Sequence, residues 1–374
     1  MRILHTADLH IGKSVHDFSM LEDQRAILTQ ITEILQREKI DVMLLAGDIY
    51  DRAVPSAQAV TLLDEFMTNV SHMKIPVIAI SGNHDSPERL EFLNGVLEKQ
   101  GIFISGIYRD VLKKVTFEDS YGKVTFVCLP YFRSGELGFK SSQEVAENLL
   151  AEAQIDTTQR NVLLTHYFVT EQGRAPELSD SETALQVGGI DNVEAEVFRD
   201  YDYVALGHIH RPQQIGSRMM YYAGSPLKYS FSETNQEKSV NIITLGEKGD
   251  ITVAKEILTP LHDMRKIRGT MAQILEAAPD TPDMDYIQVS LTDEEELYDP
   301  MGTLRSVYPN VMELILTKNL IREEQQGEKR RADRSRTPMQ MFEDFYREVR
   351  GNEMDEARRE LMIRIMKEAE EECR

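Results

Sequence analysis

Short, mainly apolar runs alternate with longer amphipathic stretches along the first hundred residues. The runs at 3–7, 41–47 and 77–81 predict buried β-strands. The stretches at about 21–38 and 56–73 repeat apolar residues at helical spacing, which predicts two helices. Strands that alternate with helices of this length predict βαβ units and a mainly parallel sheet.

Further strands are expected in the middle of the chain. They lie at 124–129, 161–166, 203–207, 219–223, 239–245 and 251–257. The later segments follow one another at hairpin spacing, so the predicted sheet is mixed.

The pattern changes after about residue 260, which divides the chain into parts. The predicted parts are a large α/β domain at 1–262, a small α+β unit at 263–320, a charged linker at 321–336 and a helical region at 337–374. Within the small unit we expect a helix near 271–278 and strands at 285–291 and 311–317.

Apolar residues recur at helical spacing in the last part of the chain. One stripe contains Phe342, Phe345, Tyr346 and Val349, and a second contains Leu361, Met362, Ile365, Met366 and Ala369. Such stripes are either ordinary core or a surface that docks on a partner protein.

Composition limits the class of protein. The chain of 374 residues is 41% hydrophobic, which suits a globular protein, and its two cysteines, Cys128 and Cys373, lie far apart. This spacing excludes a disulfide framework and a thiolate zinc site. No apolar run approaches the ~20 residues of a membrane span, so we expect a cytoplasmic protein without membrane contact. The net charge of -21 argues against a generally basic, nucleic-acid-coating surface.

Polar residues of a restricted set follow the predicted strands. They are Asp8 and His10, then Asp48 and Asp51, then Asn83, His84 and Asp85, then His166, and finally His208 and His210. Because ligands bind at the carboxyl ends of the strands in parallel α/β sheets, we expect these side chains to converge.

Carboxylates, imidazoles and an amide oxygen together are ligands for manganese, iron or zinc rather than calcium. The donors are too many for one ion that must keep an open position, and two ions about 3.5–4 Å apart would use them economically. Two other interpretations stay open. The acidic and amide residues could cap turns and helix N-termini, and His166 alone could be a core histidine.

The ordered motifs DxH, GDxxD, GNHD, an isolated His after a strand, and GHxH resemble those of the calcineurin-like metallophosphoesterases. The segments "HTADLHIGK", "ISGNHDSPERL" and "TPMQMFEDFY" are similar to nuclease subunits of bacterial complexes that process double-strand breaks. The resemblance covers essentially the whole chain and is closest over residues 1–230. It implies a β-sandwich of mixed sheets flanked by helices, with a small α+β capping domain that binds DNA and C-terminal helices.

The resemblance also implies roles for the candidate residues. Asp8, His10 and His210 would hold a first ion, Asn83, His166 and His208 a second, and Asp48 would bridge both. His84 would donate a proton to the leaving oxygen, Asp85 would orient or charge-stabilise His84, and Asp51 would support a liganding histidine. The ions are expected to be Mn(II).

The implied function is ATP-dependent exonuclease action on duplex ends and endonuclease action on single strands or hairpins. An ATPase partner would bind the helices at 337–374, and the protein would form a homodimer within a heterotetramer, with a helix at about 88–100 as the candidate interface. The basic residues Lys329, Arg330, Arg331, Arg334 and Arg336 are either a solvated linker or a DNA contact. The alternative substrates are cyclic nucleotides or phosphoproteins, and the alternative class is a non-catalytic scaffold.

Overall fold

The computed structural model describes residues 1–180, 182, 192–279 and 281–317, together with isolated positions between 339 and 365. The chain falls into two units, which are considered separately below. The first contains Met1–Ile267, Pro279–Gln288 and Arg305–Glu313, and the second contains Arg268–Ala278, Val289–Leu304 and Leu314–Arg374.

One sheet of the first unit is built around the N-terminal strand. Its strand order is β16 (Ile251–Ile257), β15 (Ser239–Leu245), β1 (Arg2–Thr6), β4 (Val42–Ala46), β5 (Val77–Ile80) and β6 (Ile102–Ser105). Strands β1, β4, β5 and β6 run parallel, and β15 is antiparallel to both β1 and β16.

A second sheet has the order β13 (Gln213–Gln214), β14 (Met220–Tyr222), β12 (Tyr203–Leu206), β9 (Arg160–Thr165), β8 (Gly122–Leu129) and β7 (Lys113–Asp119). Its inner strands β14, β12, β9 and β8 are parallel, while β13 and β7 are antiparallel edges. The predicted mixed α/β fold with several sheets is therefore confirmed.

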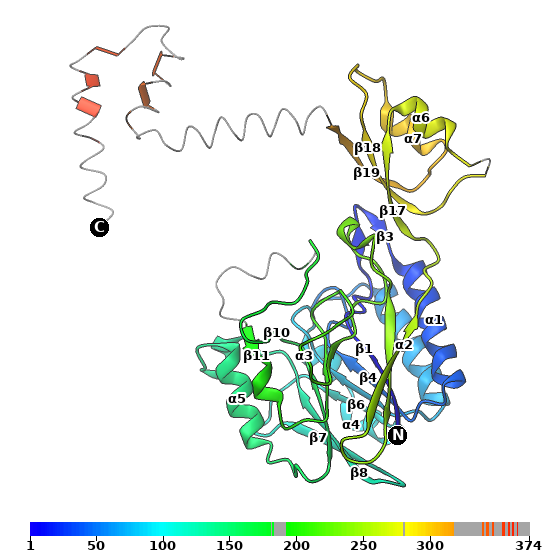
Figure 1. The fold of residues 1–374 in the computed structure, drawn as a ribbon, viewed down its shortest axis with the longest axis vertical. Helices are drawn as coiled ribbons and strands as arrows, with labels where there is room; N and C mark the ends of the chain where they lie inside the picture. Colours follow the sequence, from blue (N-terminus) through cyan, green and yellow to red (C-terminus); the bar gives the residue numbers. More distant parts are fainter. Residues whose placement is uncertain are drawn as a thin grey trace. The chain divides into compact units, whose positions relative to one another are not determined.

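Helices cover the outer faces of the sandwich (Figure 1). Helices α1 (Leu21–Arg37) and α2 (Ala57–His72) pack on the first sheet, and α5 (Ser142–Glu152) packs on the second. Helix α2 begins where the Ser56 hydroxyl accepts a hydrogen bond from the Ala59 N–H at 3.2 Å. The helices predicted at 21–38 and 56–73 are confirmed to within one residue at each end.

The space between the sheets is filled by apolar side chains from both. The first sheet supplies Ile3, Val42, Leu44, Ile78 and Ile80, and the second supplies Phe126, Cys128, Val162, Leu164 and Ala205. Each fully buried aliphatic or aromatic side chain of this kind stabilises the fold by about 1.5–3 kcal/mol. The resulting layer fixes the two sheets against each other, and with them the ends of their strands.

The segment after β5 differs from its prediction. Instead of a helix at 88–100, the chain forms the short helices α3 (Pro87–Leu90) and α4 (Asn94–Leu97) and a 3-10 turn at Glu98–Gln100. Leu93 lies between them with φ +58°, a left-handed conformation that cannot continue a helix. The continuous-helix prediction is therefore wrong.

The later part of the chain contains a sheet with the order β17 (Met264–Gly269), β18 (Tyr286–Leu291) and β19 (Val311–Leu316). Helix α6 (Met271–Glu276) starts at a capping box formed by Thr270 and Gln273. The helix and strands predicted here are confirmed, whereas β17 and α7 (Pro300–Arg305) were not predicted. The domain boundaries drawn from the sequence stay a prediction.

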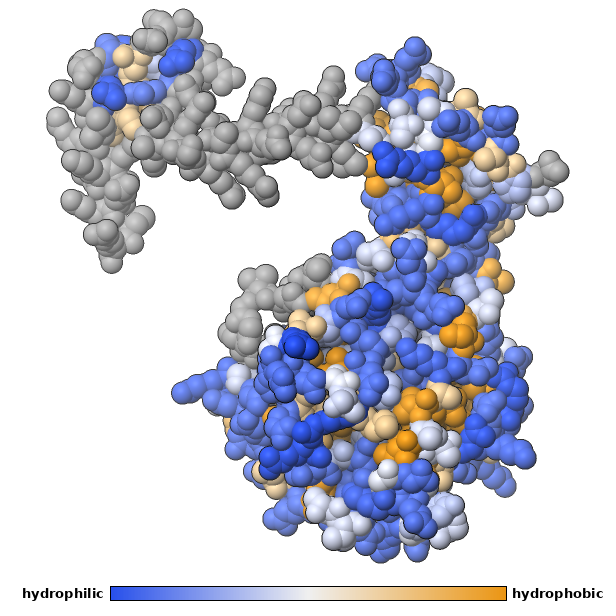
Figure 2. Space-filling model, in the orientation of Figure 1, coloured by the Kyte–Doolittle hydropathy of each residue, from blue (hydrophilic) through white to orange (hydrophobic). Residues whose placement is uncertain are grey.

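The face displayed in Figure 2 is mainly hydrophilic, with small, separate apolar patches. Within the described ranges, the helices all fall short of the length and apolarity needed to cross a membrane. Cys128 is buried in the core. Cys373, the basic residues at 329–336 and most of the helical region at 337–374 lie outside the described residues.

Candidate metal centre

The predicted site residues follow the carboxyl ends of strands from both sheets. Backbone and side-chain hydrogen bonds tie these ends together. The Asp8 N–H donates to the Gly47 carbonyl at 3.1 Å, and the His208 N–H donates to Asp8 Oδ1 at 2.8 Å. The His84 N–H donates to Asp48 Oδ1 at 2.9 Å. The convergence of strands β1, β4, β5 and β12 follows from these bonds.

Close approach of the loops explains the glycines of the motifs. A Cβ atom on Gly207 would lie 1.9 Å from the Ala46 carbonyl oxygen, and one on Gly82 would lie 2.1 Å from Asp48 Oδ1. Several candidate ligands also have left-handed backbones, which such residues adopt rarely. They are Asp8, His10, Asp48 and His208. Strain of this kind concentrates at functional sites.

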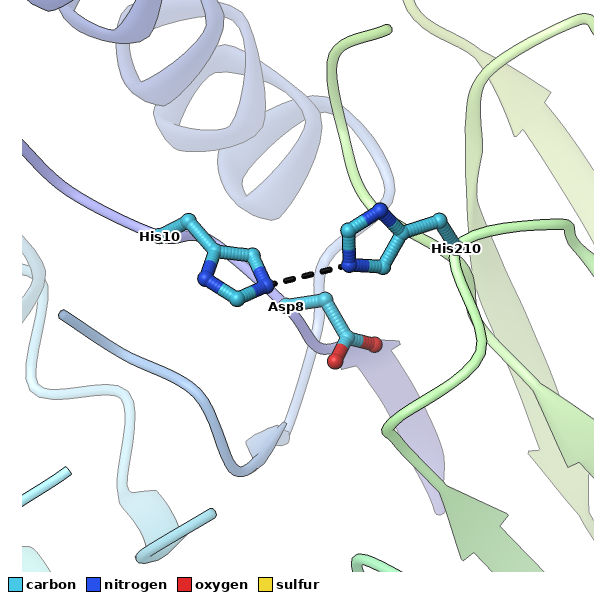
Figure 3. Close-up of side chains that lie close together, drawn as sticks. All are labelled: Asp8, His10 and His210. Atoms are coloured by element: carbon cyan, nitrogen blue, oxygen red, sulfur yellow. Dashed lines mark hydrogen bonds between the residues drawn. The ribbon is translucent and has the colours of Figure 1, made fainter. Parts of the chain in front are cut away.

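One cluster consists of Asp8, His10 and His210, whose ligand atoms lie within 4.8 Å of one another (Figure 3). The Nε2 atoms of His10 and His210 are 3.0 Å apart. Among the described residues, none forms a hydrogen bond with Asp8 Oδ2, although this oxygen is buried. Two imidazole nitrogens and an orphaned carboxylate oxygen fit a divalent cation.

A second cluster forms around the Asn83 amide. Asn83 Oδ1 lies 3.2 Å from His166 Nε2 and 3.0 Å from His208 Nδ1. The His166 Nδ1–H donates to the Ala46 carbonyl at 2.7 Å, which leaves the lone pair of Nε2 directed at the cluster. An amide oxygen and two imidazoles are again suitable donors for a transition-metal ion.

Asp48 lies between the two clusters. Its Oδ2 atom is 3.6 Å from His10 Nε2 and 3.3 Å from His166 Nε2. Both histidines are completely buried or nearly so, and Asp48 is 3% exposed, so solvent does not separate the charges. This carboxylate is therefore placed to contact cations in both clusters.

The electrostatics of the site favour the binding of a positive charge. Burial raises the pKa of Asp8 to about 7, although neighbouring imidazoles oppose the shift. Desolvation lowers the pKa of His208 to about 3, so its ring is neutral and able to act as a ligand. Burial alone would lower the pKa of His166, but the Asp48 carboxylate raises it to about 9. A cation would take the place of that proton.

His84 and Asp85 are held by different hydrogen bonds. His84 Nδ1 lies 2.9 Å from the Asp51 backbone oxygen, which orients the ring. The Asp85 carboxylate instead accepts hydrogen bonds from the backbone N–H groups of Gly82 (2.9 Å), Ile49 (3.1 Å) and Tyr50 (2.9 Å). Asp85 thus joins two loops, and its predicted role of orienting or charge-stabilising His84 stays a prediction.

Asp51 lies beside His10, a candidate ligand. Its Oδ1 atom is 3.6 Å from His10 Nδ1 and accepts a hydrogen bond from Lys13 Nζ at 2.7 Å. A residue missed from the sequence is Gln24, whose Nε2–H donates to the His10 carbonyl at 2.8 Å and whose Oε1 accepts from the Gly12 N–H at 2.9 Å. The sequence pattern could have indicated Gln24, because it is a polar residue on the mainly apolar, buried face of α1.

Buried charged residues around His210 were also missed. They are Glu182, Glu233 and Lys238. Nothing in their sequence context distinguishes them from surface residues, because such polar residues are mostly exposed.

Two family models match the chain. The calcineurin-like phosphoesterase family model matches residues 1–212, and the model described as a type 5 capsule protein repressor C-terminal domain matches residues 260–350.

Among curated proteins, the chain is similar to the D subunit of the nuclease SbcCD from Staphylococcus epidermidis, with 34% identity over 84% of this chain and 85% of that protein. The same-named protein of Staphylococcus saprophyticus is 34% identical over 84% of each chain. A solved structure, TT1561 of Thermus thermophilus, aligns with 14% identity and a TM-score of 0.41 over 68% of this chain and 98% of that one, a likeness too distant to carry an argument.

Proposed function

The chain belongs to the calcineurin-like phosphoesterase family, and from this premise we propose that it is the DNA nuclease component of an SbcCD-type complex. The observation that carries the proposal is the position of Asp48 between two donor clusters at the joined strand ends. That arrangement supports hydrolysis of a phosphodiester by two divalent cations.

In this proposal Asp8, His10 and His210 hold a first cation, Asn83, His166 and His208 hold a second, and Asp48 contacts both. Mn(II) suits such a mixture of imidazole, carboxylate and amide donors. When bound, the two cations would stabilise the charge on phosphate oxygens and lower the pKa of a water that attacks phosphorus.

His84 is proposed to deliver a proton to the leaving sugar oxygen. Its Nδ1–H donates to the Asp51 carbonyl, so Nε2 is the atom that can hold and release the proton. The side chain of His84 is 37% exposed, whereas that of His10 is 2% exposed. His84 can therefore reach a bound substrate, while His10 is confined to the donor cluster.

The proposed assembly includes an SbcC-type ATPase that binds the region at 337–374, with ATP-dependent cutting of duplex ends and endonuclease action on single strands or hairpins during DNA repair. A homodimer interface at α3 and α4 is supported by exposed apolar side chains. Phe92 is 71% exposed, and Leu93 and Val96 are each 57% exposed. We propose the small unit at 263–320 as the part that binds DNA.

The decisive experiment compares substrates under identical conditions. The purified chain with Mn(II) is assayed on linear duplex DNA, single-stranded DNA, bis-p-nitrophenyl phosphate, a cyclic nucleotide and a phosphopeptide, with and without a chelator. We expect chelator-sensitive cleavage of DNA and of the diester. Hydrolysis of the cyclic nucleotide or phosphopeptide without DNA cleavage would refute the nuclease proposal.

A further inference from the structure

His210 is held on three sides by buried charged groups. Its backbone N–H donates to the Glu182 carboxylate, and its backbone carbonyl accepts a hydrogen bond from Lys238 Nζ at 2.8 Å. Its ring atom Nδ1 faces Glu233 Oε1 at 3.6 Å. The main chain and the ring of one proposed ligand are thus fixed together.

Lys238 and Glu233 form an ion pair in the interior. Lys238 is 4% exposed and Glu233 is fully buried, and their Nζ and Oε2 atoms are 2.6 Å apart. Lys238 Nζ also donates to Ser225 Oγ and Gln236 Oε1, both at 3.0 Å. Because the cost of desolvating a buried pair offsets most of its attraction, stability alone does not explain it.

His10 is supported in the same way. Its Nδ1 atom faces Asp51 Oδ1, and Asp51 is paired with Lys13 at 2.7 Å. The ring of His166, in the second cluster, instead donates to the neutral carbonyl of Ala46. A carboxylate paired with a lysine therefore stands behind both imidazoles of the first cluster.

We propose that Glu233 and Lys238 are a positioning pair for His210, which sets the affinity of the first cation position and leaves the second unaffected. The inference rests on the two-cation site proposed above. The Glu233 carboxylate fixes the ring with Nδ1 toward itself and the Nε2 lone pair toward the cluster. Lys238 holds both that carboxylate and the His210 carbonyl, so the ring and backbone cannot shift separately.

The test measures Mn(II) binding to the full chain by the paramagnetic resonance signal of the free ion. The variants are Lys238→Met, Glu233→Gln and both together. The matched control is Lys248→Met, which removes a lysine paired with Asp202 at 2.7 Å away from the cluster. We expect one of the two binding events to weaken by about 10–100-fold in the single variants. The other event should not change, and neither event should change in the control.

The double variant separates positioning from charge balance, because it removes the positive and the negative member of the buried pair together. We expect its melting temperature to return toward that of the unchanged protein while one Mn(II) stays weakly bound. Recovery of both the melting temperature and the Mn(II) affinity would overturn the inference. Equal weakening of the two Mn(II) binding events would overturn it as well. Should Lys238→Met not fold, Glu233→Gln and the double variant decide the question.

The same Mn(II) titration distinguishes a failure of the positioning role from a failure of the proposed two-cation site. If the unchanged protein bound a single Mn(II), the two-cation site and the positioning role would both be wrong. If it bound two and the variants behaved like the control, the positioning role alone would be wrong.

Discussion

The Nε2 atoms of His10 and His210 lie 3.0 Å apart, although the two residues are separated by 200 positions in the chain. One ring follows β1 of the first sheet and the other follows β12 of the second. At most one of the two nitrogens can donate a proton to the other, and a cation near both would use both lone pairs. The sandwich thus brings ligands from separate sheets to one point.

Replacement of His84 by Gln should reduce cleavage of DNA without reducing cation binding. Gln keeps a side chain of similar length but cannot hold a transferable proton near neutral pH, so we expect cleavage of DNA to fall by about 10²–10⁴-fold. Mn(II) stoichiometry, measured by elemental analysis after dialysis, should stay that of the unchanged protein. An equal loss of Mn(II) would assign His84 to the ligands.

Replacement of Asp48 by Ala should empty both cation positions, because its Oδ2 lies within 3.6 Å of one donor in each cluster. The same stoichiometry measurement checks this result. Asp202→Ala is a suitable control, since Asp202 is a largely buried carboxylate that pairs with Lys248 outside the site. Retention of two ions by Asp48→Ala would remove it from the bridging role.

The strands and the residues that follow them could be predicted from the sequence because apolar runs and their polar ends are local patterns. The contacts that orient those residues could not. The hydrogen bonds of Asp85 run to Ile49 and Tyr50 on another loop, and Lys238 reaches His210 across the fold. Such partners are set by tertiary packing, which leaves no periodic signal in a single chain.

The break at Leu93 is a second example. The residues from 88 to 100 have helical composition, but the chain turns at Leu93 with φ +58°. Asn94 there pairs with the main chain of Ile104 on the edge strand β6, with Nδ2 donating at 3.0 Å. A helical pattern therefore did not decide the local structure, because a tertiary contact of this kind leaves no signal in the local sequence.

The exposed apolar residues Phe92 and Leu93, between α3 and α4, and Val96 of α4 predict a self-association surface. Val96→Glu should convert a dimer to a monomer, because a charge buried in an apolar interface lacks a partner. Sedimentation velocity measures the outcome. Ile257→Glu is the matched control, since Ile257 is 51% exposed on β16, which forms the opposite edge of the first sheet from β6. If Val96→Glu and Ile257→Glu sedimented alike, the interface would lie elsewhere.

Acid stability should depend on Asp119. Its carboxylate accepts hydrogen bonds from Arg160 Nη1 (3.1 Å) and Nη2 (2.5 Å), and the Arg160 guanidinium holds the pKa of Asp119 well below its usual range. A depressed pKa stabilises the folded state above the unfolded value of about 4, and this stabilisation is lost as pH falls toward the folded value.

Asp119→Asn should therefore lower the melting temperature most near pH 7, because Arg160 is 2% exposed and would lose its counter-charge. The difference from the unchanged protein should shrink below about pH 4, where the carboxyl group of the unfolded chain gains a proton while that of the folded protein stays ionised. Melting curves between pH 3 and pH 7 check this. A difference independent of pH would mean that packing of the side chain, and not its charge, stabilises the fold.

Deletion of residues 337–374 should separate cleavage from assembly. The candidate ligands and His84 all precede residue 211, and the described core of the first unit is built from residues before 314, so the metal site does not need this region. The deleted segment carries the Phe342 and Tyr346 stripe, whose spacing suits docking on a partner helix. We expect Mn(II)-dependent cleavage of DNA to persist while co-purification with the ATPase is abolished.

Tyr346→Ala in the full chain is the milder variant and should weaken co-purification without changing Mn(II) binding. Co-purification that survived the deletion would place the docking surface on the described units instead.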